Sequence, residues 1–472
     1  MTANRAGRAA TVLLASGAFV GLVAGPSLAG GPTAGASSAG DPYFPVQGNG
    51  GYDVGHYGLT LDFRPASGVL NGVATIDATA TQALSRFDLD LRRTMAVSSV
   101  TVGGRPAAFA QPVELRQELV ITPAVALAAG AGFTVVVRYS GVPRPVTDPD
   151  GSIDGWVPTE DGAFVVNEPQ GSPSWYPCND TPRDKAGFDI TMTVPQGLTA
   201  IANGALVDTA TAHGRTTYRW RQPQPMSTYL AFVTTGRFQV STGRTPSGIP
   251  YLNAVDPTEA DKSRPELAKL PAMVDFFQSV YGKYPWNSAG ALVDHAPEVG
   301  YALETTTRPE FDSAPDELTL AHEIAHQWVG DDVTLARWRD IWLNEGFAEW
   351  SSWYWSEHTG QATAQRFFQR LYATSAKNTD VWSPPPGNPG GAADLFDDSI
   401  YDRGAMTLQA LRVKIGDDAA FLDLLHDWVA AHRYGNATVD DFVAFTEHRF
   451  PRLALAHFFH VWLYQPGKPT DW

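Results

Sequence analysis

The segment LTLAHEIAHQWVG, residues 318–330, contains two histidines and a glutamate whose spacing suits metal chemistry. Residues four apart lie on one face of an α-helix, so His322 and His326 would direct both imidazoles at one point. Paired imidazoles of this kind are common ligands of Zn²⁺. Glu323 lies about 100° around the helix from His322. That position suits a base that takes a proton from an attacking water better than it suits a third ligand.

A third ligand is expected from the next helix, in the segment WLNEGFAEW. Glu345 follows His326 with eighteen residues between them. Its apolar neighbours Leu343 and Phe347 imply burial, and a buried carboxylate without a partner is costly. Two histidines and one carboxylate leave a fourth position for water, as in a catalytic zinc site. The alternative is that Glu345 and Glu349 are solvated acids on a helix surface.

Helices must position these residues, and the pattern after about residue 250 predicts them. Apolar residues recur there at helical spacing. The predicted helices are 261–281, 316–329, 344–356, 363–374, 404–415, 418–432, 439–450 and 453–463. A small sheet is expected just before the first of the two motif helices.

Residues from about 50 to 243 have the pattern of strands instead. Segments rich in Val, Thr, Phe and Tyr are separated by Gly, Pro, Asp or Asn, and the clearest are 58–63, 73–80, 119–122, 133–139, 188–194 and 229–234. Many short strands at this spacing indicate an antiparallel sandwich or saddle. The predicted class is α+β and multidomain, with a β domain at 47–243 and a mostly α catalytic domain at 244–472.

The first residues have the pattern of an export signal. Arg5 and Arg8 precede an uncharged apolar stretch, and Ser27-Leu28-Ala29 offers small residues for cleavage. We therefore expect a signal peptide at 1–29, cleaved near Ala29, and a secreted, extracellular protein. Residues 30–46 are rich in Gly, Ala and Ser and are expected to form a flexible leader. An uncleaved membrane anchor is the alternative, although the segment is short for a span.

Composition excludes several other classes of protein. The 472 residues are 43% hydrophobic, which is globular rather than disordered. A net charge of −16 without a basic run argues against nucleic acid or an anionic membrane surface as a partner. The single cysteine, Cys178, cannot form an intramolecular disulfide, and we interpret it as a buried apolar side chain. The DPDGSIDG segment at 148–155 fits a turn better than a calcium loop.

Taken together, HEIAHQWVGDDVT and WLNEGFAEW resemble the gluzincin M1 family of zinc metallopeptidases, which includes aminopeptidases N and leukotriene A4 hydrolase. Three further segments share the resemblance: WYPCNDTP with DKA at 175–186, YDRGA at 401–405 and WLYQPGKP at 462–469. The resemblance covers nearly the whole chain after the signal. It implies a thermolysin-like catalytic domain with one Zn²⁺ per chain. It also implies a short form without the family's C-terminal domains, and therefore a more open cleft.

The resemblance assigns roles to individual residues. It implies that His322, His326 and Glu345 hold the zinc ion and that Glu323 is the general base. Tyr401 would donate a hydrogen bond to the oxyanion of the tetrahedral intermediate. His457 and His460 have no third ligand nearby in the sequence, so we interpret them as ordinary helix residues.

An exopeptidase also needs acids that hold the free α-ammonium group of its substrate. The resemblance implies that these are Glu304, in YALET, and Glu168, in NEP. The family's Gly, Met and Asn around the first of these acids are changed here, which leaves the geometry of substrate-backbone binding open.

The sequence therefore predicts an exported zinc aminopeptidase that acts on peptides with a free N-terminus. Two alternatives stay open. One is a zinc endopeptidase or an epoxide hydrolase of the same family. The other is a non-catalytic secreted peptide-binding protein whose zinc is structural. The preferred first residue and the oligomeric state are not indicated by any motif.

Overall fold

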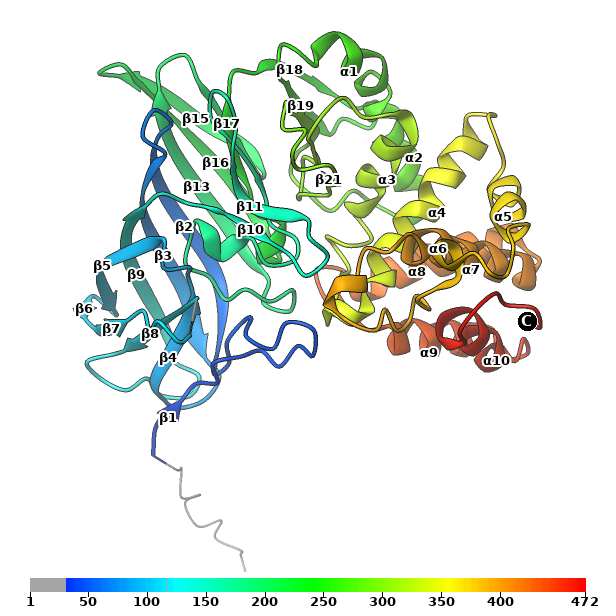
Figure 1. The fold of residues 1–472 in the computed structure, drawn as a ribbon, viewed down its shortest axis with the longest axis horizontal. Coiled ribbons are helices and arrows are strands. Elements are labelled where there is room, and N and C mark those ends of the chain that lie inside the picture. The colour runs from blue at the N-terminus through cyan, green and yellow to red at the C-terminus, as the bar shows by residue number, and fades with distance from the viewer. Residues whose placement is uncertain (1–30, 116) are drawn as a thin grey trace, which may run out of the picture. The chain divides into compact units, whose positions relative to one another are not determined.

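The computed structural model describes residues 31–115 and 117–472, in which most strands precede the helices along the chain (Figure 1). Pro32–Trp472 forms one compact unit. The predicted signal peptide, 1–29, lies outside the described residues. Among the residues that are described, no helix combines the length and hydrophobicity that crossing a bilayer requires.

A large twisted sheet forms the outer face of the β-rich part. Its strand order is β15 (Ala205–Ala212), β16 (Arg215–Met226), β13 (Ala186–Pro195), β2 (Tyr52–Arg64), β3 (Val69–Ala80), β9 (Gly132–Gly141), β5 (Met95–Val102) and β6 (Arg105–Pro106). Alternate residues of β2 are buried, including Leu59, Leu61 and Phe63, because successive strand side chains point to opposite faces. β13 pairs with β2 in parallel, so the sheet is mixed rather than wholly antiparallel as predicted.

Two smaller sheets complete the β-rich part. One has the order β10 (Pro145–Thr147), β11 (Ile153–Pro158), β12 (Ala163–Val166), β17 (Val233–Gly236) and β14 (Thr199–Ala202). The other has the order β1 (Thr33–Ala34), β4 (Leu84–Asp90), β8 (Glu118–Thr122) and β7 (Ala108–Ala110). Phe63 of the large sheet contacts Trp156 of β11 edge to face at 4.9 Å, so the sheets share one aromatic core.

The second half contains the predicted small sheet and then the helices. The sheet order is β18 (Gln239–Arg244), β19 (Pro250–Val255), β20 (Ala289–Val293), β22 (Glu310–Phe311) and β21 (Ala302–Leu303). The α-helices are α1 (Ala260–Leu267), α2 (Leu270–Tyr281), α3 (Glu317–His326), α4 (Trp342–His358), α5 (Ala364–Tyr372), α6 (Thr379–Trp382), α7 (Asp398–Ile415), α8 (Asp418–His432), α9 (Val439–Arg449) and α10 (Leu455–Phe459). β23 (Thr334–Leu335) pairs with β24 (Asn436–Ala437). The mostly β first part and helical second part confirm the predicted α+β class.

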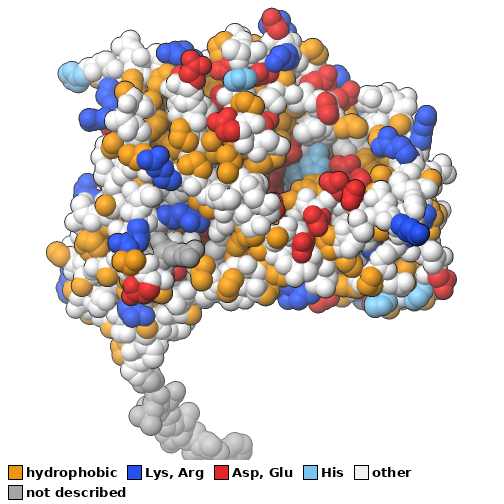
Figure 2. Space-filling view, in the orientation of Figure 1, with side chains coloured by type: hydrophobic (Ala, Val, Ile, Leu, Met, Phe, Trp, Pro, Cys, Tyr) orange, Lys and Arg blue, Asp and Glu red, His pale blue; other side chains and the backbone are white. Residues whose placement is uncertain are grey.

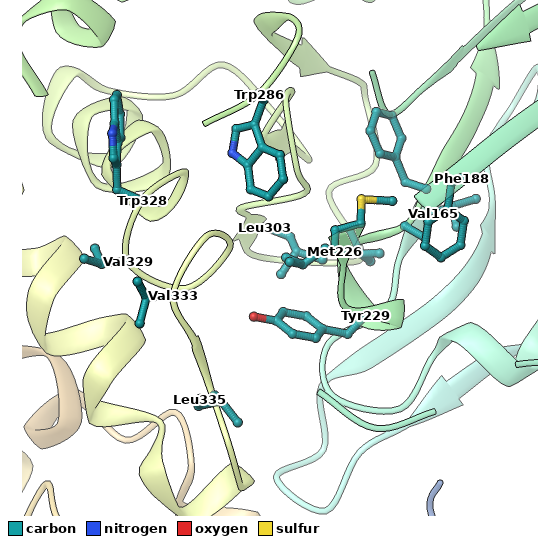
Figure 3. Close-up of a cluster of buried hydrophobic side chains, with 14 of the residues drawn as sticks. Val165, Phe188, Met226, Tyr229, Trp286, Leu303, Trp328, Val329, Val333 and Leu335 are labelled. Atoms are coloured by element: carbon teal, nitrogen blue, oxygen red, sulfur yellow. The ribbon is translucent and has the colours of Figure 1, made fainter. Parts of the chain in front are cut away.

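The two parts meet through a buried apolar cluster and a lysine. Phe188 and Met226 of the β-rich part lie near Leu303 and Trp286 of the helical part (Figure 3). Lys185, just before β13, donates hydrogen bonds to the carbonyls of Asp331, Asp332 and Gly435 at 2.8–3.0 Å. These carbonyls follow α3 and α8, so one side chain ties the β-rich part to both.

The helix predicted at 404–415 begins earlier, as α7 at Asp398. Two other expected elements differ in kind. The predicted helix 261–281 is two helices, because Pro271 in the first turn of α2 has no N–H for the turn before it. The predicted strand 229–234 begins as a 3₁₀ turn at Thr228–Leu230. The carbonyl of Thr228 accepts from Ser172 Oγ and from the Tyr176 hydroxyl instead of from a neighbouring strand.

The expectation of a flexible leader at 30–46 is wrong for the part that is described. β1 pairs with β4 in parallel. Phe44 is buried and contacts the ring of Trp338 at 5.9 Å. Asp41 accepts a hydrogen bond from the backbone N–H of Trp338 at 2.9 Å. These contacts hold the segment against the rest of the fold, although its Gly, Ala and Ser content predicted a flexible leader.

Candidate metal centre

Helix α3 carries the first two candidate ligands and starts at a well-formed cap. The Asp316 carboxylate accepts hydrogen bonds from the N–H groups of Leu318 and Thr319, both at 2.9 Å. These are N–H groups of the first turn, which have no partner within the helix. His322 and His326 follow on one face, and both are buried. Their rings lie 4.8 Å apart, centroid to centroid.

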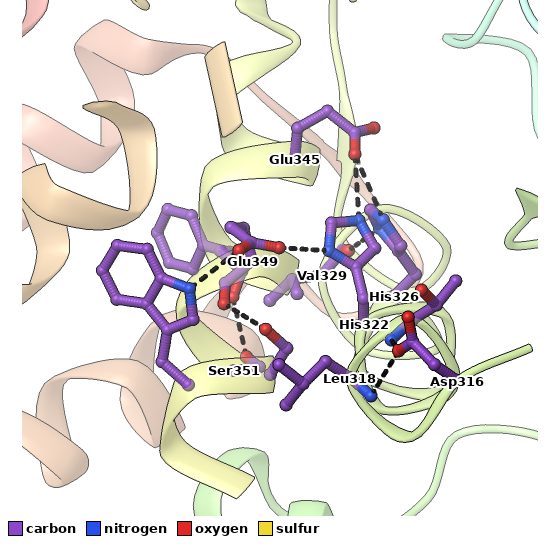
Figure 4. Close-up of polar contacts among 12 residues, drawn as sticks. Asp316, Leu318, His322, His326, Val329, Glu345, Glu349 and Ser351 are labelled. Atoms are coloured by element: carbon purple, nitrogen blue, oxygen red, sulfur yellow. Dashed lines mark hydrogen bonds and ion pairs between the residues drawn. The ribbon is translucent and has the colours of Figure 1, made fainter. Parts of the chain in front are cut away.

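Helix α4 packs against α3 and brings Glu345 to the same point. Its Oε2 lies 3.2 Å from His322 Nε2 and 3.4 Å from His326 Nε2 (Figure 4). Zn²⁺ with ligands at 2.0–2.2 Å in a tetrahedron separates its donor atoms by ~3.3 Å. The donor set therefore fits a zinc ion in both chemistry and spacing. Burial alone would raise the pKa of Glu345, but the two histidines more than offset it and hold the pKa at about 2.

The two imidazoles are oriented by different acceptors on their other nitrogens. His322 Nδ1 lies 3.2 Å from Glu349 Oε2, one turn beyond Glu345 on α4. His326 Nδ1 lies 2.9 Å from the carbonyl of Val329. Glu349 is itself held by Trp353 Nε1, at 2.7 Å from its other oxygen. An acceptor at each Nδ1 favours the tautomer that carries its proton there. Each Nε2 then keeps a lone pair for a metal.

Tyr401 lies on α7, and its ring faces that of His322. The two rings are 5.9 Å apart and 28° from parallel. A close glycine contact sets this position: a Cβ on Gly346 of α4 would lie 3.0 Å from the Cα of Gly404 and 2.5 Å from the Trp342 ring. Glycine at both positions thus lets α7 approach α4. Burial, with the neighbouring acids, raises the pKa of Tyr401 well above its usual value.

Three more buried acids surround the donor set. Glu323 is on α3, Glu304 follows β21 and Glu168 follows β12, and each has a side-chain oxygen without a hydrogen-bond partner among the described residues. Single oxygens of Glu168, Glu304 and Glu345 lie within 4.8 Å of one another. Burial raises the pKa of Glu304 to about 7 and, reinforced by Glu304, raises the pKa of Glu168 well above its usual range.

A cavity of about 470 Å³ opens onto these groups. In the space-filling view a histidine is visible in a hollow with acidic side chains around it (Figure 2). Every residue that the sequence proposed for the site lines this cavity: Glu168, Glu304, His322, Glu323, His326, Glu345 and Tyr401.

Sequence reasoning missed three acids at or beside the site. Glu349 was weighed only as a solvated acid, although its spacing of four from Glu345 places it on the same helix face. Asp150 lies in the segment interpreted as an ordinary turn, and Asp398 carried no signal. Both line the cavity. Cys178 is buried, as we interpreted it. His457 Nε2 lies 3.0 Å from the backbone carbonyl of Asp471.

In a comparison with known proteins, both parts of the fold match domains of one peptidase family. Residues 54–230 match the Peptidase M1 N-terminal domain, and residues 302–462 match the Peptidase family M1 domain. The fold and its donor set thus define a two-domain zinc metallopeptidase. The chain belongs to peptidase family M1.

Its relatives include aminopeptidases and two-domain metallopeptidases. Human endoplasmic reticulum aminopeptidase 1 is 26% identical over 420 residues, 82% of this chain and 44% of that protein. The chain spans less than half the length of the curated relatives it matches. A two-domain M1 zinc metallopeptidase variant bound to L-arginine has a TM-score of 0.84 and 29% identity, over 92% of this chain and 99% of that one. A variant of the Deinococcus radiodurans M1 zinc metallopeptidase bound to Tyr-Ser-Ala has a TM-score of 0.83 and 29% identity, over 92% and 100%.

Proposed function

We propose that this chain is an exported aminopeptidase that removes the first residue from peptides. The observation that carries the proposal is the pair of buried acids, Glu168 and Glu304, next to the His322–His326–Glu345 donor set. Buried carboxylates without partners are unfavourable unless a cation joins them. A free α-ammonium group is such a cation, and holding it there would bring the first peptide bond to the metal.

In this proposal the metal ligands and Glu323 carry out the hydrolysis itself. Zn²⁺, held by His322, His326 and Glu345, would supply a Lewis acid for the scissile carbonyl. Glu323 takes a proton from the attacking water and delivers it to the leaving amine. Burial raises the pKa of Glu323 despite the two nearby histidines, which makes it a stronger base than an exposed glutamate.

Tyr401 acts on the charge that appears during the reaction. Its hydroxyl donates a hydrogen bond to the oxygen that becomes negative as the carbonyl turns tetrahedral. A phenol has a pKa of about 10 and is protonated at neutral pH, and burial at this site raises the pKa of Tyr401 further. A donor that is fixed before the reaction stabilises the transition state more than the substrate.

The comparisons support the same activity. Several relatives are named aminopeptidases, and one neighbouring structure holds the tripeptide Tyr-Ser-Ala. Export is part of the proposal and rests on the sequence pattern of residues 1–29. Mass spectrometry of the culture medium tests it, because export predicts a secreted chain that lacks residues 1–29.

The activity is tested with matched peptides that have a free or an N-acetylated amine. Wild-type protein is expected to cleave the free peptides, to lose this activity with a chelator and to regain it with Zn²⁺. Glu323→Gln should keep zinc and lose hydrolysis by at least about 100-fold. Equal cleavage of acetylated peptides would indicate an endopeptidase. Hydrolysis of an epoxide but not of peptides would indicate an epoxide hydrolase, and peptide binding without any turnover would indicate a binding protein.

A further inference from the structure

The cavity above the metal centre is lined by acids and by no Lys or Arg. Four of its acids have tasks in the proposed aminopeptidase reaction. Asp150 and Asp398 have none. An adjoining depression continues the same chemistry, because it shares Asp398, adds Asp380 and Asp397, and also has no Lys or Arg in its lining.

The acids of the cavity differ in burial: we call the buried ones its floor and the exposed ones its rim. Glu168 and Glu304 are 7% and 3% exposed, whereas Asp150 and Asp398 are exposed. The two rim acids come from distant parts of the chain. Asp150 is in the loop between β10 and β11, and Asp398 is in the first turn of α7.

The rim acids are held in place by local structure. Asp150 Oδ1 accepts hydrogen bonds from the N–H and the hydroxyl of Ser152 at 2.9 and 2.7 Å, which fixes the loop. Asp398 lies at the N-terminus of an 18-residue helix, where a negative charge is favourable. The acids also repel one another electrostatically. Burial and then the charges of Asp394, Asp398 and Asp150 raise the pKa of Asp397.

We propose that Asp150 and Asp398 select peptides whose first residue carries a long cationic side chain, arginine or lysine. The inference rests on the proposed aminopeptidase function. With the α-ammonium group held on the floor by Glu168 and Glu304, the side chain of the first residue must occupy the rest of the cavity. A short side chain stays near the floor, whereas a long one reaches the rim.

The remaining lining suits an arginine or lysine stem. Phe396, Tyr301 and Ala302 provide apolar surface between the floor and the rim. Long cationic side chains bury their methylene stems on such surface and keep the charged head near water. Since the two aspartates are exposed, each contact is worth only a few-fold in kcat/KM, and salt weakens it.

The test compares arginine with citrulline, its uncharged isostere, as the first residue of otherwise identical peptides. At low ionic strength the wild-type kcat/KM ratio of arginine to citrulline is expected to be about 5–20. Asp150→Asn and Asp398→Asn should each lower the ratio by about two- to fivefold, and the double variant should bring it near one. Asp423→Asn, on the exposed face of α8 and outside both linings, serves as the matched control and should leave the ratio unchanged.

Several outcomes would overturn the inference. A wild-type ratio near one, or a ratio that the double variant keeps, removes the role of the rim acids while leaving the aminopeptidase proposal intact. Discrimination that appears only when arginine and citrulline are in the second position removes the assignment to the first residue. If no peptide with a free amine is cleaved, the proposed function fails, and the inference fails with it. Thermal melts of all variants establish that each one is folded.

Discussion

At the scale of single residues, the two candidate histidine ligands differ in what supports them. His326 is oriented by a backbone carbonyl, which no side-chain substitution removes directly. His322 is oriented by the carboxylate of Glu349. A carboxylate on the far nitrogen fixes the tautomer and ring orientation and makes the imidazole a better metal ligand. The affinity for zinc should therefore depend on Glu349 although this residue does not reach the donor cluster.

We predict that Glu349→Ala weakens zinc binding by about 10–100-fold, because His322 loses both its orientation and the nearby negative charge. Glu349→Gln keeps an acceptor without the charge and should lose less. The measurement is a titration of metal-free protein against a chromophoric zinc chelator. Glu160→Gln, an exposed acid outside the cavity lining, is the control. Dissociation constants that match the wild type would contradict the prediction.

The identities of the site residues were more predictable than their support. His322, Glu323 and His326 are linked by helical periodicity, which is a local property of the sequence. Glu345 followed from burial and charge in the next helix. The contact between Glu349 and His322, in contrast, depends on the rotation of α4 against α3, and that rotation is set by packing between helices.

At the scale of elements, α3 must begin at the correct residue for its histidines to face α4. Asp316 caps it. Without this carboxylate, the N–H groups of Leu318 and Thr319 would lose their acceptor. We predict that Asp316→Ala lowers the free energy of unfolding by about 1 kcal/mol. Chemical denaturation measures this loss. Asp316→Asn, which also caps well, should retain most of the stability, and an equal loss in both variants would argue against the cap.

The boundaries of the other elements show what local patterns can and cannot predict. The caps and apolar periodicity of α8 and α9 are local, and both helices start at or near the predicted residues. The break between α1 and α2 was visible only in a proline inside a strongly apolar pattern. The parallel pairing of β13 with β2 joins segments more than a hundred residues apart, and no local pattern specifies it.

At the scale of the whole molecule, the β-rich part contributes directly to the candidate site. Glu168 comes from this part, and Lys185 ties it to the loop that follows α3. The cavity thus needs both parts to be folded and docked. A buried acid of the β-rich part whose pKa changes on unfolding makes the free energy of unfolding depend on pH. The site depends on that free energy because it exists only in the folded protein.

Glu118 is such an acid, on β8 and opposite Asp90 of β4. Burial, with the charges of Asp90 and Asp88, raises its pKa to about 9. Arg86 lies 3.8 Å from Asp88 in this cluster and is about half exposed. In the unfolded chain a glutamate has a pKa of about 4.3. Between these two values the folded state holds a proton that the unfolded state has lost.

The sign of the pH dependence follows from this difference. The stabilising contribution of protonated Glu118 is complete below about pH 4 and is lost as the pH rises toward 9, by at most ~1.4 kcal/mol per pH unit. Glu118→Gln has no proton to lose, so we predict that its unfolding free energy, relative to wild type, increases by about 1–3 kcal/mol between pH 5 and pH 8. Denaturant titrations at each pH measure this, with Glu114→Gln as the control because that side chain is exposed in the preceding loop. Parallel pH profiles for Glu118→Gln and wild type would show that Glu118 is ionised in the folded protein, so that Asp88, Asp90 or another group would have to account for any pH dependence.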